Sequence, residues 1–174
     1  KDAEFNSGTV GGKTSNNGII SNGNFQWNVY NYKDISGGTF QGEVINDYSY
    51  DYAASKYIPG VISGGVFQGN VNNHGNISDG TFQGEVYNNR TISDGTFQGE
   101  VFNYGIISDG TFQGEVYNHY TISGGTFEKR MTLMNDDASI TISDGLFDGE
   151  VFTGICRFPL SITGGLFTKA VDVS

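Results

Sequence analysis

The stretch ISDGTFQGEV, residues 77–86, recurs without a change at residues 92–101 and at residues 107–116. The three copies start fifteen residues apart, and related segments continue this spacing toward both ends of the chain. Aligning the segments gives ten coil starts: Phe5, Ile20, Ile35, Ile62, Ile77, Ile92, Ile107, Ile122, Ile142 and Ile162. A fixed period of this kind is the sequence signature of a repeat architecture, in which each repeat stacks on its neighbours.

The residues of one coil alternate between apolar and polar. We number the coil positions from 1 to 15, so that Ile77 stands at position 1. Phe82 at position 6 is flanked by the polar Thr81 and Gln83, and Val86 follows at position 10. Alternation with a period of two is typical of a strand with one buried face. Three short strands per turn, each with a large apolar side chain pointing inward, make a β-solenoid.

Two further columns, one of glycine and one of asparagine, support this interpretation. Glycine occupies position 4 of every coil, which predicts a corner whose backbone conformation is costly for other residues. Asparagine at position 12 predicts a ladder in which the side-chain amide of one coil hydrogen-bonds to the next. Seven coils carry it: Asn16, Asn31, Asn46, Asn73, Asn88, Asn103 and Asn118.

The predicted fold is therefore all-β: a single parallel β-solenoid of about ten 15-residue coils that spans residues 1–174 as one domain. We expect the right-handed form. The three longer intervals between coil starts hold insertions, which follow Asp47, Leu133 and Thr153. One coil buries too few apolar groups to offset the entropy of ordering it, so its neighbours must supply the balance.

The composition excludes several classes of partner. The chain has nine basic and nineteen acidic residues and a net charge of −10, so we expect it to bind neither nucleic acid nor anionic membrane surfaces. No apolar run approaches the length of about twenty residues that a membrane span requires, so we expect no membrane insertion. Cys156 is the one cysteine, which excludes an intramolecular disulfide framework.

The repeats resemble those of a known group of proteins. The segment ISGGTF at residues 35–40 and 122–127, together with QGEV and NHGNISDGTFQGEV, is similar to the Gly- and Asn-rich short repeats of bacterial secreted or cell-surface, adhesin-like proteins. The similarity spans nearly the whole chain. It implies a β-helical stalk or adhesin module, and hence an extracellular or cell-surface location.

Acidic columns raise the question of a metal site. Glutamate recurs at position 9 and aspartate at position 3: Glu43, Glu85, Glu100, Glu115, Glu150, Asp79, Asp94, Asp109 and Asp144. A Ca²⁺ ion would relieve the repulsion, but it needs about six oxygen ligands, and the calcium-binding Gly-Gly-x-Gly-x-Asp repeat is absent. His74 and His119 fall roughly 14 Å apart along the stack, too far to share a metal. We therefore predict no metal and no cofactor, and interpret the columns as solvated faces that discourage sideways aggregation.

Three other functions stay open as alternatives. A polysaccharide-active β-helix enzyme would need acidic residues and a basic residue in a cleft, and Asp136 and Asp137 near Arg130 are the one acidic doublet close to an arginine. The Thr and Ser columns at positions 15 and 2, as at Thr91 and Ser93, resemble the ice-binding faces of insect antifreeze proteins. Free strand edges at the solenoid ends would allow self-association into a filament. We predict no catalytic residues and no enzyme activity.

Aromatic residues are the candidate binding groups. They form a column at position 11 and fill the first insertion: Tyr87, Phe102, Tyr117, Tyr48, Tyr50, Tyr52 and Tyr57. Exposed tyrosines offer flat, amphipathic surfaces to sugars or to a partner protein. For the column we favour a ladder that only stiffens the rod. Solenoids often place binding sites in such insertions, so we expect a non-enzymatic structural or adhesive rod that displays the Tyr-rich loop and the outer columns to a glycan or a surface protein.

Overall fold

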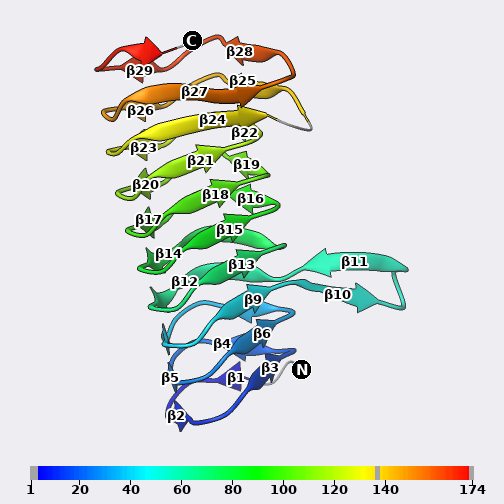
Figure 1. The fold of residues 1–174 in the computed structure, drawn as a ribbon. Helices are drawn as coiled ribbons and strands as arrows, with labels where there is room; N and C mark the ends of the chain where they lie inside the picture. Colours follow the sequence, from blue (N-terminus) through cyan, green and yellow to red (C-terminus); the bar gives the residue numbers. More distant parts are fainter. Residues whose placement is uncertain (1–3, 136–137, 173–174) are drawn as a thin grey trace.

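The strands stack in register to form a rod (Figure 1). The computed structural model describes residues 4–135 and 138–172. Equivalent positions of successive coils pair in parallel, as in Ile77 with Ile92, Phe82 with Phe97 and Val86 with Val101. The predicted parallel β-solenoid with a period of about fifteen residues is thus confirmed. The described residues include no helix that is long and apolar enough to cross a membrane.

Each regular coil contributes three short strands, one to each of three rows. The first row lies at positions 15 and 1: β1 (Glu4–Phe5), β4 (Ile19–Ile20), β7 (Asp34–Ile35), β12 (Val61–Phe67), β14 (Asn76–Phe82), β16 (Thr91–Ile92), β19 (Ile106–Ile107), β22 (Thr121–Ile122), β25 (Ile140–Ile142) and β28 (Leu160–Ile162). The second row lies at positions 5 and 6: β2 (Thr9–Val10), β5 (Asn24–Phe25), β8 (Thr39–Phe40), β17 (Thr96–Phe97), β20 (Thr111–Phe112), β23 (Thr126–Phe127), β26 (Leu146–Phe147) and β29 (Leu166–Phe167). The long strands β12 and β14 run through both rows and join them into one sheet.

The third row forms a separate sheet at positions 10 to 12. Its strands are β3 (Thr14–Asn16), β6 (Val29–Asn31), β9 (Val44–Asn46), β13 (Val71–Asn73), β15 (Val86–Asn88), β18 (Val101–Asn103), β21 (Val116–Asn118), β24 (Met131–Asn135), β27 (Val151–Cys156) and β30 (Val171–Asp172). Strands β10 (Tyr48–Asp51) and β11 (Lys56–Pro59) stand outside these rows and pair with each other in antiparallel fashion.

The interior of the rod is a stack of similar apolar layers. From Phe25 to Phe167 the phenylalanine rings at position 6 lie face to face, with centroids 4.5–4.9 Å apart and planes within 4–8° of parallel. Isoleucine at position 1 and valine at position 10 close the remaining walls, and both columns are buried over most of the rod. The spacing of the rings equals that of neighbouring strands, so the side chains repeat with the backbone.

The asparagine ladder is present as predicted. Each amide nitrogen donates to the amide oxygen of the asparagine in the next coil over 2.7–2.8 Å, from Asn16 to Asn118. These side chains are buried, so the hydrogen bonds satisfy groups that water cannot reach. Position 12 of the next coil is Leu133, whose side chain is apolar, and the side-chain amide of Asn118 donates to the carbonyl of Tyr120.

Two kinds of glycine shape the corners. All ten glycines at position 4 have φ between +100° and +137°, a region that residues with a Cβ rarely adopt, so the predicted corner is confirmed. The glycines at position 8 have no positive φ, and a different constraint acts on them. A Cβ on Gly99, for example, would overlap the backbone carbonyl of Gly84 in the coil below. Close stacking of coils explains glycine at most position-8 sites.

All three insertions leave the rod between positions 12 and 15, at one edge of the coil. The first forms the β10–β11 hairpin, which projects to the right in Figure 1. The second and third begin as extensions of β24 and β27, which pair with each other at Leu133 and Thr153. None of them breaks the stack. Strand β12 pairs with β7 and β8 across the hairpin, β25 pairs with β22 across the second insertion, and β28 pairs with β25 across the third.

Candidate binding surface

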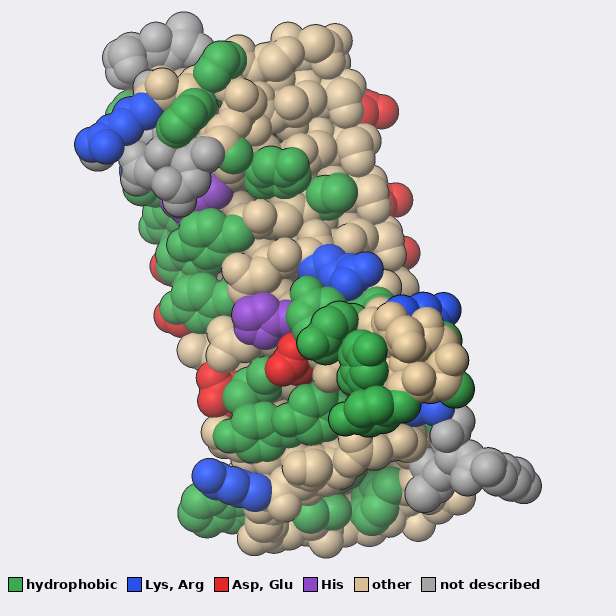
Figure 2. All heavy atoms as spheres, turned by 90° about the vertical axis from the view of Figure 1, so that its right-hand side faces the viewer, with side chains coloured by type: hydrophobic (Ala, Val, Ile, Leu, Met, Phe, Trp, Pro, Cys, Tyr) green, Lys and Arg blue, Asp and Glu red, His purple; other side chains and the backbone are tan. Residues whose placement is uncertain are grey.

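The edge of the rod that carries the insertions also gathers exposed aromatic side chains. We call this edge, formed by coil positions 13 to 15, the insertion corner. Above the hairpin it comprises residues 74–76, 89–91, 104–106 and 119–121, and Figure 2 looks onto it. These twelve residues include no aspartate and no glutamate. In Figure 2 most of the acidic side chains lie along the left and right margins of the molecule, with apolar, basic and uncharged groups between them.

The hairpin has one aromatic face. Because alternate residues of a strand point to the same side, the pairs Tyr50 with Tyr57 and Tyr48 with Pro59 share a face. The rings meet edge to face: Tyr50 lies 5.0 Å from Tyr57 and 4.9 Å from Tyr52 between centroids, with interplanar angles of 65° and 82°. This arrangement leaves ring faces open, and Tyr52 and Tyr57 are 86% and 72% exposed.

The turn of the hairpin is fixed by local hydrogen bonds. One carboxylate oxygen of Asp51 accepts the backbone N–H groups of Ala53 and Ala54, over 2.9 and 3.0 Å. Ser55 then adopts a positive φ of 49°, which reverses the chain into β11. The sequence led us to expect a loop here. The alternation Tyr48-Ser49-Tyr50-Asp51 was the signal for a strand, and it resembles the two-residue period of the coils themselves.

A small apolar hollow lies between two of the hairpin tyrosines. Tyr48 and Tyr57 line a space of about 230 Å³, and their ring centroids are 6.3 Å apart. The guanidinium carbon of Arg90 lies 5.6 Å from the ring centroid of Tyr48, at cation–π distance. Arg90 belongs to a coil two repeats above the hairpin, so this contact ties the hairpin to the side of the rod.

A second aromatic cluster occupies the corner farther along. The rings of Tyr104 and His119 stack with centroids 4.4 Å apart and planes 21° from parallel. Together with Tyr120 and Ala138 they line a hollow of about 180 Å³. Tyr104, Ile106 and Tyr120 are exposed. The sequence carries a signal for this cluster, because Tyr104 and His119 occupy position 13 of adjacent coils and their contact follows from the period.

The aromatic column at position 11 has a different geometry. Phe102 lies between Tyr87 and Tyr117, with centroid distances of 4.8 and 4.9 Å and nearly parallel planes. Both faces of the Phe102 ring are therefore covered by its neighbours. This arrangement suits the interpretation as a stiffening ladder, because only the ring edges point outward.

The hydroxyl groups of this column are engaged by the acidic column beside it. Tyr87 donates to Glu85 over 2.8 Å and Tyr117 donates to Glu115 over 3.1 Å. The hydrogen bond to Glu85 raises the pKa of Tyr87 above its ordinary value, and desolvation and the negative charge of Glu85 act in the same direction. Glu115 raises the pKa of Tyr117 for the same reasons. Both tyrosines thus keep their proton to a higher pH than an unperturbed phenol does.

The acidic columns have structural partners rather than a common centre. At position 3, Asp79, Asp94 and Asp109 each accept the N–H of the glycine that follows, over 2.7–2.8 Å. At position 9, Glu43 accepts the side-chain amides of Asn28 and Asn72. Within the described ranges, no group of three or more His, Cys, Asp or Glu residues is placed to hold a metal ion. Asp136 and Asp137 lie outside the described residues.

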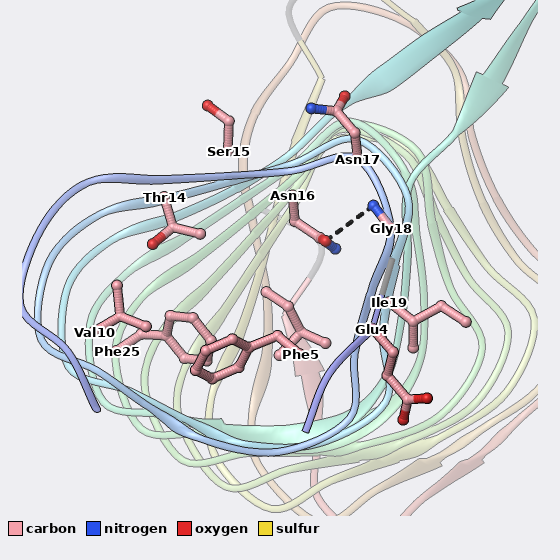
Figure 3. Close-up of a pocket in the computed structure, with 11 residues that line it drawn as sticks. Glu4, Phe5, Val10, Thr14, Ser15, Asn16, Asn17, Gly18, Ile19 and Phe25 are labelled. Atoms are coloured by element: carbon pink, nitrogen blue, oxygen red, sulfur yellow. Dashed lines mark hydrogen bonds between the residues drawn. The ribbon is translucent and has the colours of Figure 1, made fainter. Parts of the chain in front are cut away.

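Two further hollows belong to other parts of the rod. One, of about 440 Å³, is the interior of the first coil, seen along the axis in Figure 3. There Val10 and Thr14 replace the larger Phe and Val of other coils, and the Phe5 ring packs tilted against Phe25 at 5.2 Å. The other, of about 650 Å³, lies beside β27 and β30 and is lined by charged side chains that include Arg130 and Glu150.

No known protein family, curated protein or solved structure matches this chain. The structure establishes a tandem-repeat β-solenoid. The bacterial and adhesin-like character of the repeats stays a prediction that rests on their residues.

Proposed function

We propose that this protein is a non-enzymatic, extracellular display module, whose stiff β-solenoid presents the Tyr-rich hairpin to a glycan. The observation that carries the proposal is the edge-to-face cluster of Tyr48, Tyr50, Tyr52 and Tyr57 on a hairpin that stands out from the rod. A solenoid that serves only as a stalk does not need a projecting hairpin. The location outside the cell is proposed from the resemblance of the repeats.

The chemistry of the hairpin favours a sugar. A sugar ring has an apolar C–H face and a rim of hydroxyl groups, and a tyrosine offers an apolar ring with a polar hydroxyl at its tip. The hollow between Tyr48 and Tyr57 has room for part of such a ring. The tyrosines also lose little conformational freedom on binding, because each has two side-chain torsions and the cluster already holds them.

A glycan array tests this proposal. Labelled protein is expected to bind at least one class of glycan. A variant with Tyr48, Tyr50, Tyr52 and Tyr57 changed to alanine is expected to bind about a hundredfold more weakly, since buried tyrosines often dominate the affinity of an interface. Tyr117→Ala, in the column at position 11, serves as the control and should bind normally. Undiminished binding by the hairpin variant would refute the assignment, and a blank array would point to a protein partner instead.

The charged hollow beside β30 favours a second candidate function, a polysaccharide-active enzyme. Arg130, Glu150, Lys169 and Asp172 all line this hollow, so carboxylates and cations share one recess. Many polysaccharide-cleaving sites use two carboxyl groups, one as the acid and one as the base or nucleophile, and Glu150 and Asp172 are the two carboxylates that line this hollow. Release of reducing ends from a polysaccharide panel, abolished by Glu150→Gln, would support the enzyme. A protein that cleaves no polysaccharide on the panel would exclude it.

A further inference from the structure

We infer that the hairpin site takes an oligosaccharide with one carboxylated sugar, and that the Arg90 guanidinium binds the carboxylate. This inference rests on the proposed glycan-binding function and specifies its ligand. Among the described residues, Arg90 is the arginine whose guanidinium lies over a hairpin tyrosine.

Arg90 differs from the residues around it in its charge. It is the only lysine or arginine among the corner residues above the hairpin, 74–76, 89–91, 104–106 and 119–121. Its side chain is exposed, and within the described part of the chain its guanidinium has no carboxylate partner, although the protein has nineteen acidic residues. A cation that lies over an aromatic ring without a carboxylate partner is available to an incoming anion.

The contact with Tyr48 also sets where the anion would lie. A guanidinium held over a ring keeps its N–H edge free, and this edge matches the two oxygens of a carboxylate in a bidentate hydrogen bond. Tyr48 is at the same time one wall of the hollow that it shares with Tyr57. A sugar ring seated against these tyrosines would therefore hold its carboxylate beside Arg90.

The charge distribution selects a single acidic sugar rather than a polyanion. The acidic columns at positions 3 and 9 flank the corner on other faces of the rod, and the net charge of −10 opposes a long anionic chain. The two acidic residues next to the hairpin tyrosines in the chain, Asp47 and Asp51, accept backbone N–H groups of Tyr48, Ala53 and Ala54. At physiological ionic strength charges are screened over about 8 Å, so a ligand with one carboxylate beside Arg90 is affected by few of the other acidic side chains. A chain with many carboxylates would extend beyond the corner toward the acidic columns.

The second aromatic cluster offers a place for the neutral part of the ligand. Tyr104 and His119 lie one and two coils beyond Arg90, a step of about 5 Å per coil along the same corner. Their hollow with Tyr120 and Ala138 presents aromatic and polar groups, and no carboxylate of the described residues lines it. The inferred ligand is thus a short oligosaccharide that carries a carboxylated sugar at one end and uncharged sugars behind it.

Titration with matched ligands tests the inference. The probes are one oligosaccharide that ends in sialic acid and one that ends in glucuronic acid, each compared with its carboxamide analogue. For at least one pair, the wild-type protein is expected to bind the acid about tenfold more tightly than the amide. Arg90→Gln should remove this preference and leave affinity for the amide within about twofold. Lys129→Gln is the matched control, since Lys129 is an exposed cation at position 8 of its coil, away from the insertion corner, and should keep the preference.

The outcomes separate this inference from the proposal beneath it. Equal affinity of wild type for acid and amide, with the hairpin tyrosines still required, would overturn the role of Arg90 and leave glycan binding intact. An equal loss of both ligands in Arg90→Gln, not restored for the acid by Arg90→Lys, would show that Arg90 only holds the hairpin in place. Failure of every glycan to bind would overturn both ideas.

Discussion

Asn88→Ala is expected to lower the free energy of unfolding by about 4 kcal/mol. Asn88 is buried, accepts from the amide of Asn73 over 2.8 Å and donates to the oxygen of Asn103 over 2.7 Å. Its truncation leaves one buried donor and one buried acceptor without their partners, and each costs roughly 1–3 kcal/mol. Urea denaturation followed by circular dichroism measures the change.

The neighbouring residue provides the control for this prediction. Asn89 is exposed and lies beside Asn88 in the chain, so Asn89→Ala removes the same atoms without breaking the ladder. We expect its effect to stay within about 0.5 kcal/mol. If Asn88→Ala and Asn89→Ala destabilised the protein equally, the ladder would contribute nothing specific to the stacking of the coils.

Phe97→Ala is expected to destabilise the protein by about 3–5 kcal/mol. The Phe97 ring is fully buried and stacks on Phe82 and Phe112 with centroid distances of 4.7 Å on both sides. Its loss opens a cavity in the middle of the stack, which the strands cannot fill because their backbones are hydrogen-bonded in register. The loss is measured by the same denaturation experiment, with an unfolding transition that broadens or splits if the two halves of the rod separate.

Phe102→Ala separates the contribution of burial from that of stacking. Phe102 also lies between two rings, at 4.8 and 4.9 Å, but in the outer column, where the side chain is only partly buried. Its truncation loses the ring contacts without leaving an internal cavity, so we expect a loss of about 1–2 kcal/mol. A loss as large as that of Phe97→Ala would contradict the view that the interior dominates the stability of the rod.

The repeat made most of the fold predictable from the sequence. Glycine at position 4, asparagine at position 12 and phenylalanine at position 6 each recur at the period of the coil. Their corner, ladder and core roles follow from the geometry of stacked strands. The reason for glycine at position 8 was not predictable in the same way. It depends on how closely the backbone of one coil approaches the next, as at Gly99 and Gly84, and composition does not report that distance.

The candidate site was predictable only in part. The tyrosines of the first insertion indicate a binding element in a loop, whereas the structure has a hairpin with a defined aromatic face there. The contact between Arg90 and Tyr48 was missed, because it joins the insertion to a coil two repeats away and the direction of the hairpin decides it. Insertions lie outside the period, so the repeat gives no guide to their packing.

Deletion of residues 48–59 tests the central claim most directly. It shortens the interval from Ile35 to Ile62 to the regular fifteen residues, and Gly60 already donates to the carbonyl of Asp47 over 2.7 Å where the ends would join. The glycan that binds the wild type should be titrated into this variant, and the free energy of unfolding measured on the same sample. We predict a stability within about 1 kcal/mol of wild type and no measurable glycan binding. A stable deletion variant that binds the glycan as tightly as the wild type would contradict the claim that the rod displays its site on the hairpin.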